Sequence, residues 1–269
     1  MRLGRLLPPL VWLAVFTLVG VCATSWATAY DPGSGTLYSD DFEGALDEGW
    51  EQGNGFGSPS PWLQVPDGGD TSFQADGRGP FAGSPTRHWA RHFVSPVEAT
   101  SFSLAAEYRG ELGTGYAFDL EVEQRAPQLR KYRLRIGGDG TVSLWRSEGG
   151  VLVQQTATGP GFVPPNTKRW LRLEIGAGAG GQPVVRARVW GGSAEAEPST
   201  WTLEMPDANA TLERVHRFEL IADGPPDVRT WVDDLDAFGD TGAGIASSVE
   251  TIYLMELSHL DIGFTEPPD

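Results

Sequence analysis

The sequence predicts an all-β protein, an antiparallel two-sheet β-sandwich of the jelly-roll type. Short segments along the chain alternate apolar and polar residues with a period of two, so each predicted strand has one buried and one solvated face. The 269 residues include 35 glycines and 20 prolines, as expected where many short strands are joined by tight turns. The chain has no heptads, no long helical period and no internal repeat.

The first 29 residues predict a cleaved signal peptide. Arg2 and Arg5 give a positive start, residues 6–21 are mostly apolar, and residues 27–29 have the small-x-small pattern that signal peptidase accepts. We expect the mature chain to begin near Tyr30 and the protein to be secreted. An uncleaved N-terminal anchor is the alternative.

The charge of the chain excludes some partners. Removal of residues 1–29 takes away two arginines and no acids, which leaves 18 basic and 36 acidic residues and a net charge of −18. We therefore expect no nucleic acid partner and no membrane partner after signal cleavage, because nucleic acid and anionic membranes need a basic footprint. The only cysteine, Cys22, leaves with the signal peptide, so the core must be stable without disulfides.

Composition divides the rest of the chain into segments. We expect residues 30–36 to be a loose leader and residues 37–239 to form the sandwich. Residues 240–248 are rich in Gly, Ala and Ser, which predicts a flexible linker. Residues 249–269 then begin a second unit.

The strand pattern is clearest in two predicted hairpins. Residues 131–136 alternate basic and apolar side chains, a glycine-rich turn follows at 137–140, and residues 142–144 resume the apolar face. Residues 171–175 and 185–189 repeat this arrangement around a second glycine-rich turn. About a dozen such strands would make two packed antiparallel sheets.

Several stretches of residues 37–239 resemble concanavalin A-like lectin/glucanase domains, a superfamily that includes laminin-G-like modules. They are "DDFEG…LDEGW", "KYRLRIGGDGTVSLWR", "KRWLRLEIGAGAGGQPVVRARVWGGSAEAEPSTWTLE" and "VRTWVDDLDAFG". The resemblance implies a jelly-roll sandwich over nearly the whole region. The superfamily contains sugar-binding modules, interaction domains and hydrolases, so the fold alone does not choose a function.

Three carboxylates, Asp119, Glu121 and Glu123, occupy alternate positions of one predicted strand and should share one face. Retaining glucanases of the resembled superfamily place a nucleophile and an acid on such a strand. The order here is Asp-x-Glu-x-Glu, which differs from the Glu-x-Asp-x-Glu pattern of those enzymes. The alternative is an acid–base ladder in which Asp119 lies near Arg133 and Glu121 near Lys131, with the loop at residues 124–128.

Acidic residues also gather near both ends of the sandwich domain, where the first and last strands could be neighbours. Without a basic residue close by, they would repel one another unless a hard cation such as Ca²⁺ lay between them. Asp41 and Asp234 are the expected calcium ligands, and a solvated acidic edge is the alternative. The acids concerned are Asp40, Asp41, Glu43, Asp233, Asp234 and Asp236.

Exposed aromatic rings could bind carbohydrate, because sugars stack their C–H faces on them. Eight tryptophans remain after signal cleavage. Trp190 is the residue most expected to be exposed, since it shares a strand face with Arg186 and Arg188 opposite the predicted core. Most tryptophans in a sandwich are core residues instead. The candidates are Trp62, Trp89, Tyr116, Trp145 and Trp190.

The tail "IYLMELSHLDIGFT" resembles the opening strand of glycoside hydrolase family 38 α-mannosidases. The resemblance implies that His259 and Asp261 are two ligands of a catalytic zinc, while Phe264 stands where many members have Trp. Two protein ligands cannot complete such a site, so the tail is expected to be the first strand of a truncated domain. A coincidental strand and loop is the alternative.

Together these observations favour a secreted carbohydrate-binding module that binds a polysaccharide or glycan. It would have no catalytic activity by itself and would precede a truncated glycoside hydrolase. The first alternative is a structural or interaction spacer without sugar binding. The second is a glucanase that uses Asp119, Glu121 and Glu123.

Overall fold

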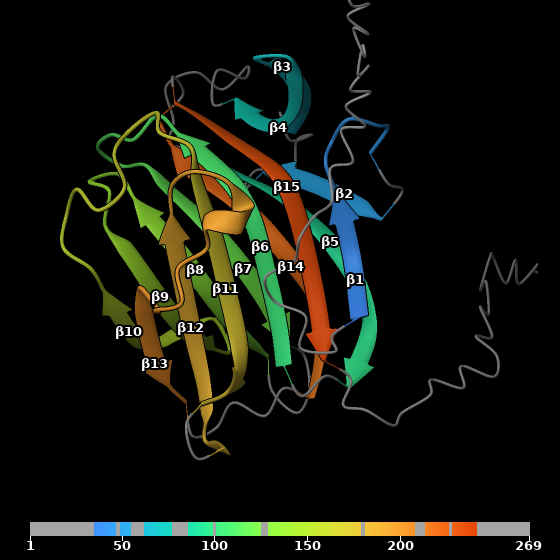
Figure 1. Ribbon diagram of the computed structural model, residues 1–269, viewed down its shortest axis with the longest axis vertical. Helices are drawn as coiled ribbons and strands as arrows, with labels where there is room; N and C mark the ends of the chain where they lie inside the picture. Colours follow the sequence, from blue (N-terminus) through green and yellow to red (C-terminus); the bar gives the residue numbers. More distant parts are fainter. Residues whose placement is uncertain are drawn as a thin grey trace, which may run out of the picture.

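The computed structural model describes residues 35–46, 49–54, 62–76, 86–98, 101–124, 129–178, 181–207, 213–225 and 228–240. These residues form an antiparallel β-sandwich of two sheets, as the sequence predicts (Figure 1). The first described strand begins at Gly35 and the last ends at Asp240. No helix within these ranges is long and apolar enough to cross a membrane.

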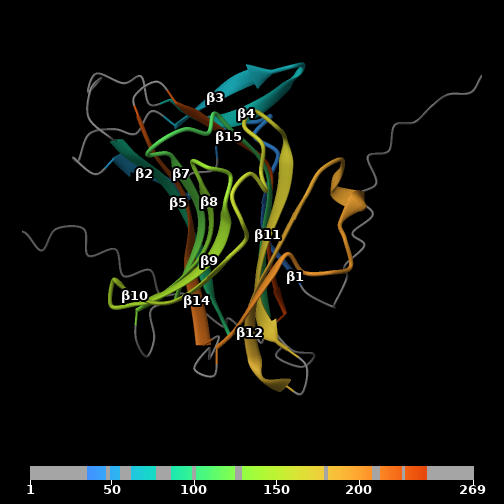
Figure 2. The ribbon, with the colours of Figure 1, turned by 90° about the vertical axis from the view of Figure 1, so that its left-hand side faces the viewer.

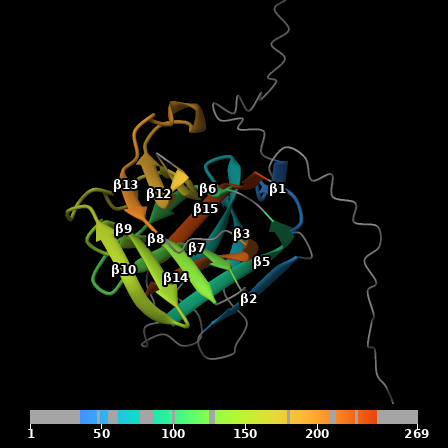
Figure 3. The same ribbon diagram turned by 90° about the horizontal axis from the view of Figure 1, so that it is seen from below.

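Sheet A has eight strands and sheet B has seven. In spatial order, sheet A contains β13 (Leu203–Pro206), β12 (Pro183–Trp190), β11 (Arg169–Ala177), β6 (Ser101–Gly110), β15 (Arg229–Asp240), β4 (Asp70–Asp76) and β3 (Trp62–Asp67), and β1 (Gly35–Asp40) also pairs with β15. Sheet B contains β10 (Val151–Ala157), β9 (Val142–Glu148), β8 (Arg130–Gly137), β7 (Ala117–Gln124), β14 (Glu213–Gly224), β5 (Thr86–Glu98) and β2 (Trp50–Asn54). The two layers are seen edge-on in Figure 2 and from below in Figure 3.

Both predicted hairpins are present. β8 pairs with β9, and Ile136 lies opposite Val142 across the glycine-rich turn. Gly140 in this turn has a φ of 76°, and a Cβ there would lie 2.3 Å from the carbonyl oxygen of Val163. Glycine is therefore required at this position by both conformation and space. The second hairpin joins β11 and β12.

The core lies between the sheets and consists of the inward-facing residues, which alternate with outward-facing ones along the strands. On β6 and β7 these include Leu104, Tyr108, Phe118 and Leu120, none of which is more than 1% exposed. Tyr108 and Phe118 stack across the two sheets with ring centroids 4.8 Å apart. Because successive residues of a strand point to opposite sides of the sheet, the polar residues that alternate with these core residues point outward.

A segment of the chain covers part of the outer face of sheet A. Residues 191–202, with the 3-10 helix η2 (Ala194–Ala196), lie over β11 and β12 on the outside of sheet A (Figures 1 and 2). Glu197 in this segment accepts hydrogen bonds from Arg172 and Arg188, and Trp201 packs over Arg188. This part of sheet A is therefore covered by the chain itself.

Candidate functional site

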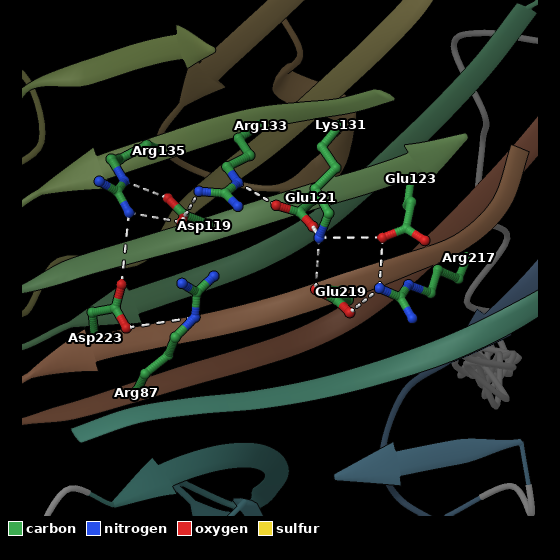
Figure 4. Close-up of polar contacts among 10 residues, drawn as sticks. All are labelled: Arg87, Asp119, Glu121, Glu123, Lys131, Arg133, Arg135, Arg217, Glu219 and Asp223. Atoms are coloured by element: carbon green, nitrogen blue, oxygen red, sulfur yellow. Dashed lines mark hydrogen bonds and ion pairs between the residues drawn. The ribbon is translucent and has the colours of Figure 1, made fainter. Parts of the chain in front are cut away.

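The outer face of sheet B has a layer of alternating charges over its central strands. Five cations and five acids from β5, β14, β7 and β8 point to the same side of the sheet (Figure 4). We call this set the charged face. It consists of Arg87, Asp119, Glu121, Glu123, Lys131, Arg133, Arg135, Arg217, Glu219 and Asp223.

Cross-strand register produces the ion pairs. Asp119 lies opposite Arg135, and this arginine donates from Nε and Nη2 to the two carboxylate oxygens at 2.6 and 2.9 Å. Glu121 lies opposite Arg133 and accepts a hydrogen bond from its Nε. Bidentate geometry of this kind makes strong, well-oriented pairs.

Lys131 lies at the centre of three carboxylates. Its Nζ is 2.6 Å from Glu121, 3.2 Å from Glu123 and 3.8 Å from Glu219. The carboxylate oxygens of these three residues lie within 4.8 Å of one another, close enough to hold a metal ion. The ammonium group of Lys131 already supplies the positive charge in this position (Figure 4). Arg217 adds a second cation, 2.5 Å from Glu123.

The two central glutamates respond to this environment in opposite directions. Burial would raise the pKa of Glu121, but Arg133 and Lys131 outweigh burial and hold its pKa below the ordinary value. The pKa of Glu219 is raised, first by burial and then by the charge of Glu121 beside it. Glu121 is therefore the ionised partner of this pair, and Glu219 binds a proton more readily.

The ladder is present, but its register differs from the sequence prediction. β7 continues through Gln124, so Asp119 faces Arg135 and Glu121 faces Arg133, two positions further along β8 than expected. Asp119, Glu121 and Glu123 are at most 2% exposed and each is paired with a cation. None of the three is open to a substrate in this structure, which gives the glucanase alternative no support.

Two of the predicted aromatic residues flank the charged face. Trp89 on β5 belongs to the same cross-strand row as Asp119 and Arg135, and Trp145 on β9 lies opposite Arg133. Both tryptophans are partly exposed. They are four strands apart, roughly 19 Å at the usual interstrand spacing.

Local contacts orient both rings. Trp89 lies against the backbone of Gly53 on β2, where a Cβ would come within 2.3 Å of the ring, and the guanidinium of Arg91 lies 4.5 Å from the ring centre. Trp145 donates from Nε1 to Ser143 Oγ at 2.8 Å. The guanidinium of Arg135 lies 4.4 Å from the centre of the Trp145 ring.

The other three aromatic candidates are buried, so the prediction that they form an exposed platform is wrong. Trp62 is 2% exposed and packs on Phe73. Tyr116 is 4% exposed and shares hydrogen bonds with Tyr108 and Thr230 inside the sandwich.

Trp190 lies on the outer face of sheet A, as predicted, but it is buried and not exposed. It is 7% exposed, stacks on Trp170 across β11 and β12, and donates from Nε1 to the carbonyl oxygen of Ser193. That carbonyl belongs to the covering segment 191–202. The strand pattern identified the outward face correctly but could not show that another segment covers it.

A second polar site lies where β1 pairs with β15, so the first and last strands are neighbours, as predicted. The register of β15 with β6 breaks between Asp233 and Asp236, and Asp234 in this bulge has a φ of 45°. A surface hollow lies beside this bulge, and we call it the acidic hollow. Its lining residues are Ser39, Asp40, Asp41, Gly44, Asp234 and Asp236.

The residues that line the acidic hollow include four aspartates and no Lys or Arg. Burial, and then the charges of Glu107 and Asp70, raise the pKa of Asp234 to about 6. Burial, and then Asp234 and Asp70, raise the pKa of Asp233 to about 7. These carboxylates and the Ser39 hydroxyl are oxygen donors of the kind that calcium prefers.

The acidic hollow has the oxygen donors that a hard cation needs, but its carboxylates are not close enough together to surround one. Among the described residues, three carboxylates come within 4.8 Å of one another on the charged face, at Glu121, Glu123 and Glu219. Asp41 and Asp234 do not belong to such a group. A calcium ion bound by them would need water or other oxygens to complete six to eight ligands.

The predicted zinc ligands, His259 and Asp261, lie outside the described residues. The same holds for residues 1–34, which include the predicted signal peptide, and for the linker from residue 241 onward. The tail resemblance and the signal peptide therefore stay predictions.

No protein family and no curated protein matches the sequence. Solved structures do match. The CBM2 module of the evolved Dit protein of Lactobacillus casei BL23 phage J-1 is 9% identical with a TM-score of 0.54, over 78% of this chain and 98% of that module. SCLam, a non-specific endo-beta-1,3(4)-glucanase from family GH16, is 10% identical with a TM-score of 0.53, over 79% of this chain and 93% of the enzyme.

A structure described as a native glycosidic hydrolase is 9% identical with a TM-score of 0.51, over 75% of this chain and 94% of that one. At such low identity these matches concern the fold and not the residues of a site. The chain has the concanavalin A-like jelly-roll sandwich fold that these proteins share.

Proposed function

We propose that this chain is a secreted carbohydrate-binding module without catalytic activity of its own, and that it binds a polysaccharide or glycan across the outer face of sheet B. One observation carries the proposal: two partly exposed tryptophans, Trp89 and Trp145, stand on the same side of one sheet at either edge of a polar surface. Aromatic rings give apolar contact to sugar rings, and the polar groups between them give hydrogen bonds.

The acids on this face support binding rather than hydrolysis. A glycosidase needs one carboxyl free to donate a proton and another free to attack or to activate water. Here each of the three candidate acids is held by a cation instead. Arg135 pairs with Asp119, Arg133 and Lys131 pair with Glu121, and Arg217 pairs with Glu123. A layer of this kind is preorganised, so little entropy is lost when a ligand contacts it.

The test is affinity gel electrophoresis of the full chain against a panel of soluble polysaccharides. Trp89→Ala and Trp145→Ala should each weaken retention by at least about tenfold, the scale expected for a tryptophan at the centre of an interface. Trp231→Ala is the matched control, because Trp231 also lies under an arginine, with Arg109 4.1 Å from its ring centre, but on sheet A.

Retention of wild type and of the Trp231 variant, with loss in the other two, is the expected result. If no polymer retains the wild-type protein, the spacer alternative replaces the proposal. If all three variants are retained equally, sugar binding does not occur on this face.

We further propose that the acidic hollow binds calcium through Asp41 and Asp234. The raised pKa values of Asp233 and Asp234 mean that their charges are costly as the structure stands, and a divalent cation would remove this cost. Calcium titrated into chelator-treated protein should raise the melting temperature, and Asp234→Asn should abolish the rise. A rise of equal size in that variant would place the calcium elsewhere.

A further inference from the structure

We propose that the ligand of the charged face is an anionic polysaccharide, recognised through its carboxylate or sulfate groups. The inference rests on the proposed function and specifies the class of ligand. The cations of β8 present hydrogen-bond donors outward, while the carboxylates of β7 are buried beneath them. A ligand that supplies acceptor groups fits this arrangement.

On β7 and β8, burial separates the two signs of charge into layers, whereas the carboxylate of Asp223 on β14 is 29% exposed. The side chains of Asp119 and Glu121 are 1% and 0% exposed, whereas those of Arg135 and Arg133 are 20% and 17% exposed. A molecule that approaches β7 and β8 therefore meets guanidinium and ammonium groups first. The carboxylate oxygens below them are already occupied.

Several donors remain after the ion pairs are made. Arg135 uses Nε and Nη2 on Asp119, and its Nη1 takes part in none of the contacts between described residues. Arg133 donates from Nε to Glu121, and its Nη1 lies 3.7 Å from Asp119. Its Nη2 has no partner among the residues that the structure describes. A guanidinium has five N–H donors in a planar fork that matches carboxylate and sulfate oxygens.

The spacing of these donors suits a repeating ligand. Arg133 and Arg135 are alternate residues of β8, so their side chains rise from the same face about 7 Å apart. Trp145 lies opposite Arg133 and beneath the guanidinium of Arg135. A charged sugar residue could thus bond to an arginine while its neighbour contacts the tryptophan ring.

The overall charge of the chain makes this inference easy to test. The sequence has a formal net charge of −16, so a polyanion is repelled by most of the molecule. Retention of an acidic polymer would therefore report a local site and not general electrostatic attraction.

The experiment measures retention of the full chain by two carboxylated polymers, polygalacturonate and alginate, by carrageenan, which carries sulfate and no carboxylate, and by the neutral polymers laminarin, mannan and xylan. We expect retention by an acidic polymer. Whether the carboxylated polymers or the sulfated polymer retain the protein identifies the recognised group as carboxylate or sulfate. The double variant Asp119→Asn with Arg135→Gln removes one buried charge pair without changing net charge. It should weaken retention by at least about tenfold, as for loss of a charged hydrogen bond.

The matched control is Glu174→Gln with Arg186→Gln. These residues also face each other across two strands, at 2.7 Å, but on sheet A. This variant should bind like wild type. Arg135→Lys keeps the ion pair and removes the planar fork, and it should also bind more weakly, which covers the case in which the double variant fails to fold.

The outcomes separate the two proposals. Retention by neutral polymers alone overturns this inference and leaves carbohydrate binding standing. Retention by no polymer overturns both. Binding of an acidic polymer that the Arg135 variants do not weaken places the anion site away from the charged face and also overturns the inference.

Discussion

The charged face and the acidic hollow show how differently one chain can treat buried carboxylates. On the charged face, each of the acids shown in Figure 4 has a cationic partner, and the pKa of Glu121 is held below its ordinary value although the residue is buried. The lining of the hollow contains no Lys or Arg, and the pKa values of Asp233 and Asp234 beside it are raised to about 7 and about 6. Burial acts in the same direction at both places, and it also raises the pKa of Glu219 and of Asp223 on the charged face. The pKa falls below its ordinary value at Glu121, where Arg133 and Lys131 together outweigh burial.

The difference has a functional consequence. Charges that are balanced within the protein can stay ionised and present a fixed surface, which suits the recognition of a ligand. Charges that are unbalanced destabilise the folded state unless a proton or a metal ion binds. The first arrangement therefore favours a polymer-binding face, and the second favours a cation site.

The largest expected effect comes from removing the central cation of the charged face. Lys131→Met leaves Glu121, Glu123 and Glu219 within 4.8 Å of one another without the ammonium group between them. Loss of one partner of a buried ion pair costs about 3–5 kcal/mol, and we expect the lower end because Lys131 is 17% exposed. Urea unfolding of wild type and variant at pH 7.5 measures the loss.

Lys168→Met is the control for this variant. Lys168 makes an equally short pair with Glu107, at 2.6 Å, but its side chain is 46% exposed, so its loss should cost less than about 1 kcal/mol. Calcium should stabilise the Lys131 variant more than it stabilises wild type or the Lys168 variant, because only the Lys131 variant has a vacated centre in addition to the acidic hollow. Equal losses in the two variants would show that burial does not govern these pairs.

Sequence reasoning could predict the parts of this comparison that depend on local pattern. The period of two located the outward positions of β7 and β8, and thus the acid–base ladder, although the end of β7 at Gln124 moved its register by two residues. The meeting of acids from both chain ends was also expected, because first and last strands often pair in such sandwiches, and β1 does pair with β15.

Long-range pairing could not be predicted in this way. Glu219 and Arg217 complete the charged face because β14 pairs with β7, and the two strands are almost a hundred residues apart. The alternation of polar and apolar residues at 217–220 indicates only that Arg217 and Glu219 share one strand face. Their partners depend on the order of strands in the sheet, which a single strand does not encode.

Burial of the tryptophans was the least predictable feature. Trp145 and Trp190 both occupy outward positions, yet Trp145 is partly exposed while Trp190 is covered by the segment that follows β12. A strand's periodicity assigns a side chain to a face and contains no information about which loop later packs on that face. Exposure of an aromatic residue must therefore be taken from the folded structure.

The smallest expected effect concerns pH and Asp233 beside the acidic hollow. Its pKa in the folded state is about 7, above the ordinary value of roughly 3.9 that applies after unfolding. Between these values the folded state holds a proton that the unfolded state lacks, so stability falls as pH rises and levels off above pH 7. With a chelator present, the free energy of unfolding should be about 2 kcal/mol higher at pH 5.5 than at pH 8, because each pH unit below 7 contributes about 1.4 kcal/mol.

Asp233→Asn should remove most of this difference, since asparagine cannot titrate. Asp234, whose pKa is raised to about 6, titrates in the same range, so the informative quantity is the change in slope between wild type and variant, measured by urea unfolding at both pH values. Glu121 should add nothing to that slope, because its lowered pKa keeps it ionised throughout. An unchanged slope in the variant would mean that Asp233 is balanced after all, and the contrast between the two carboxylate clusters would then rest on Asp234 alone.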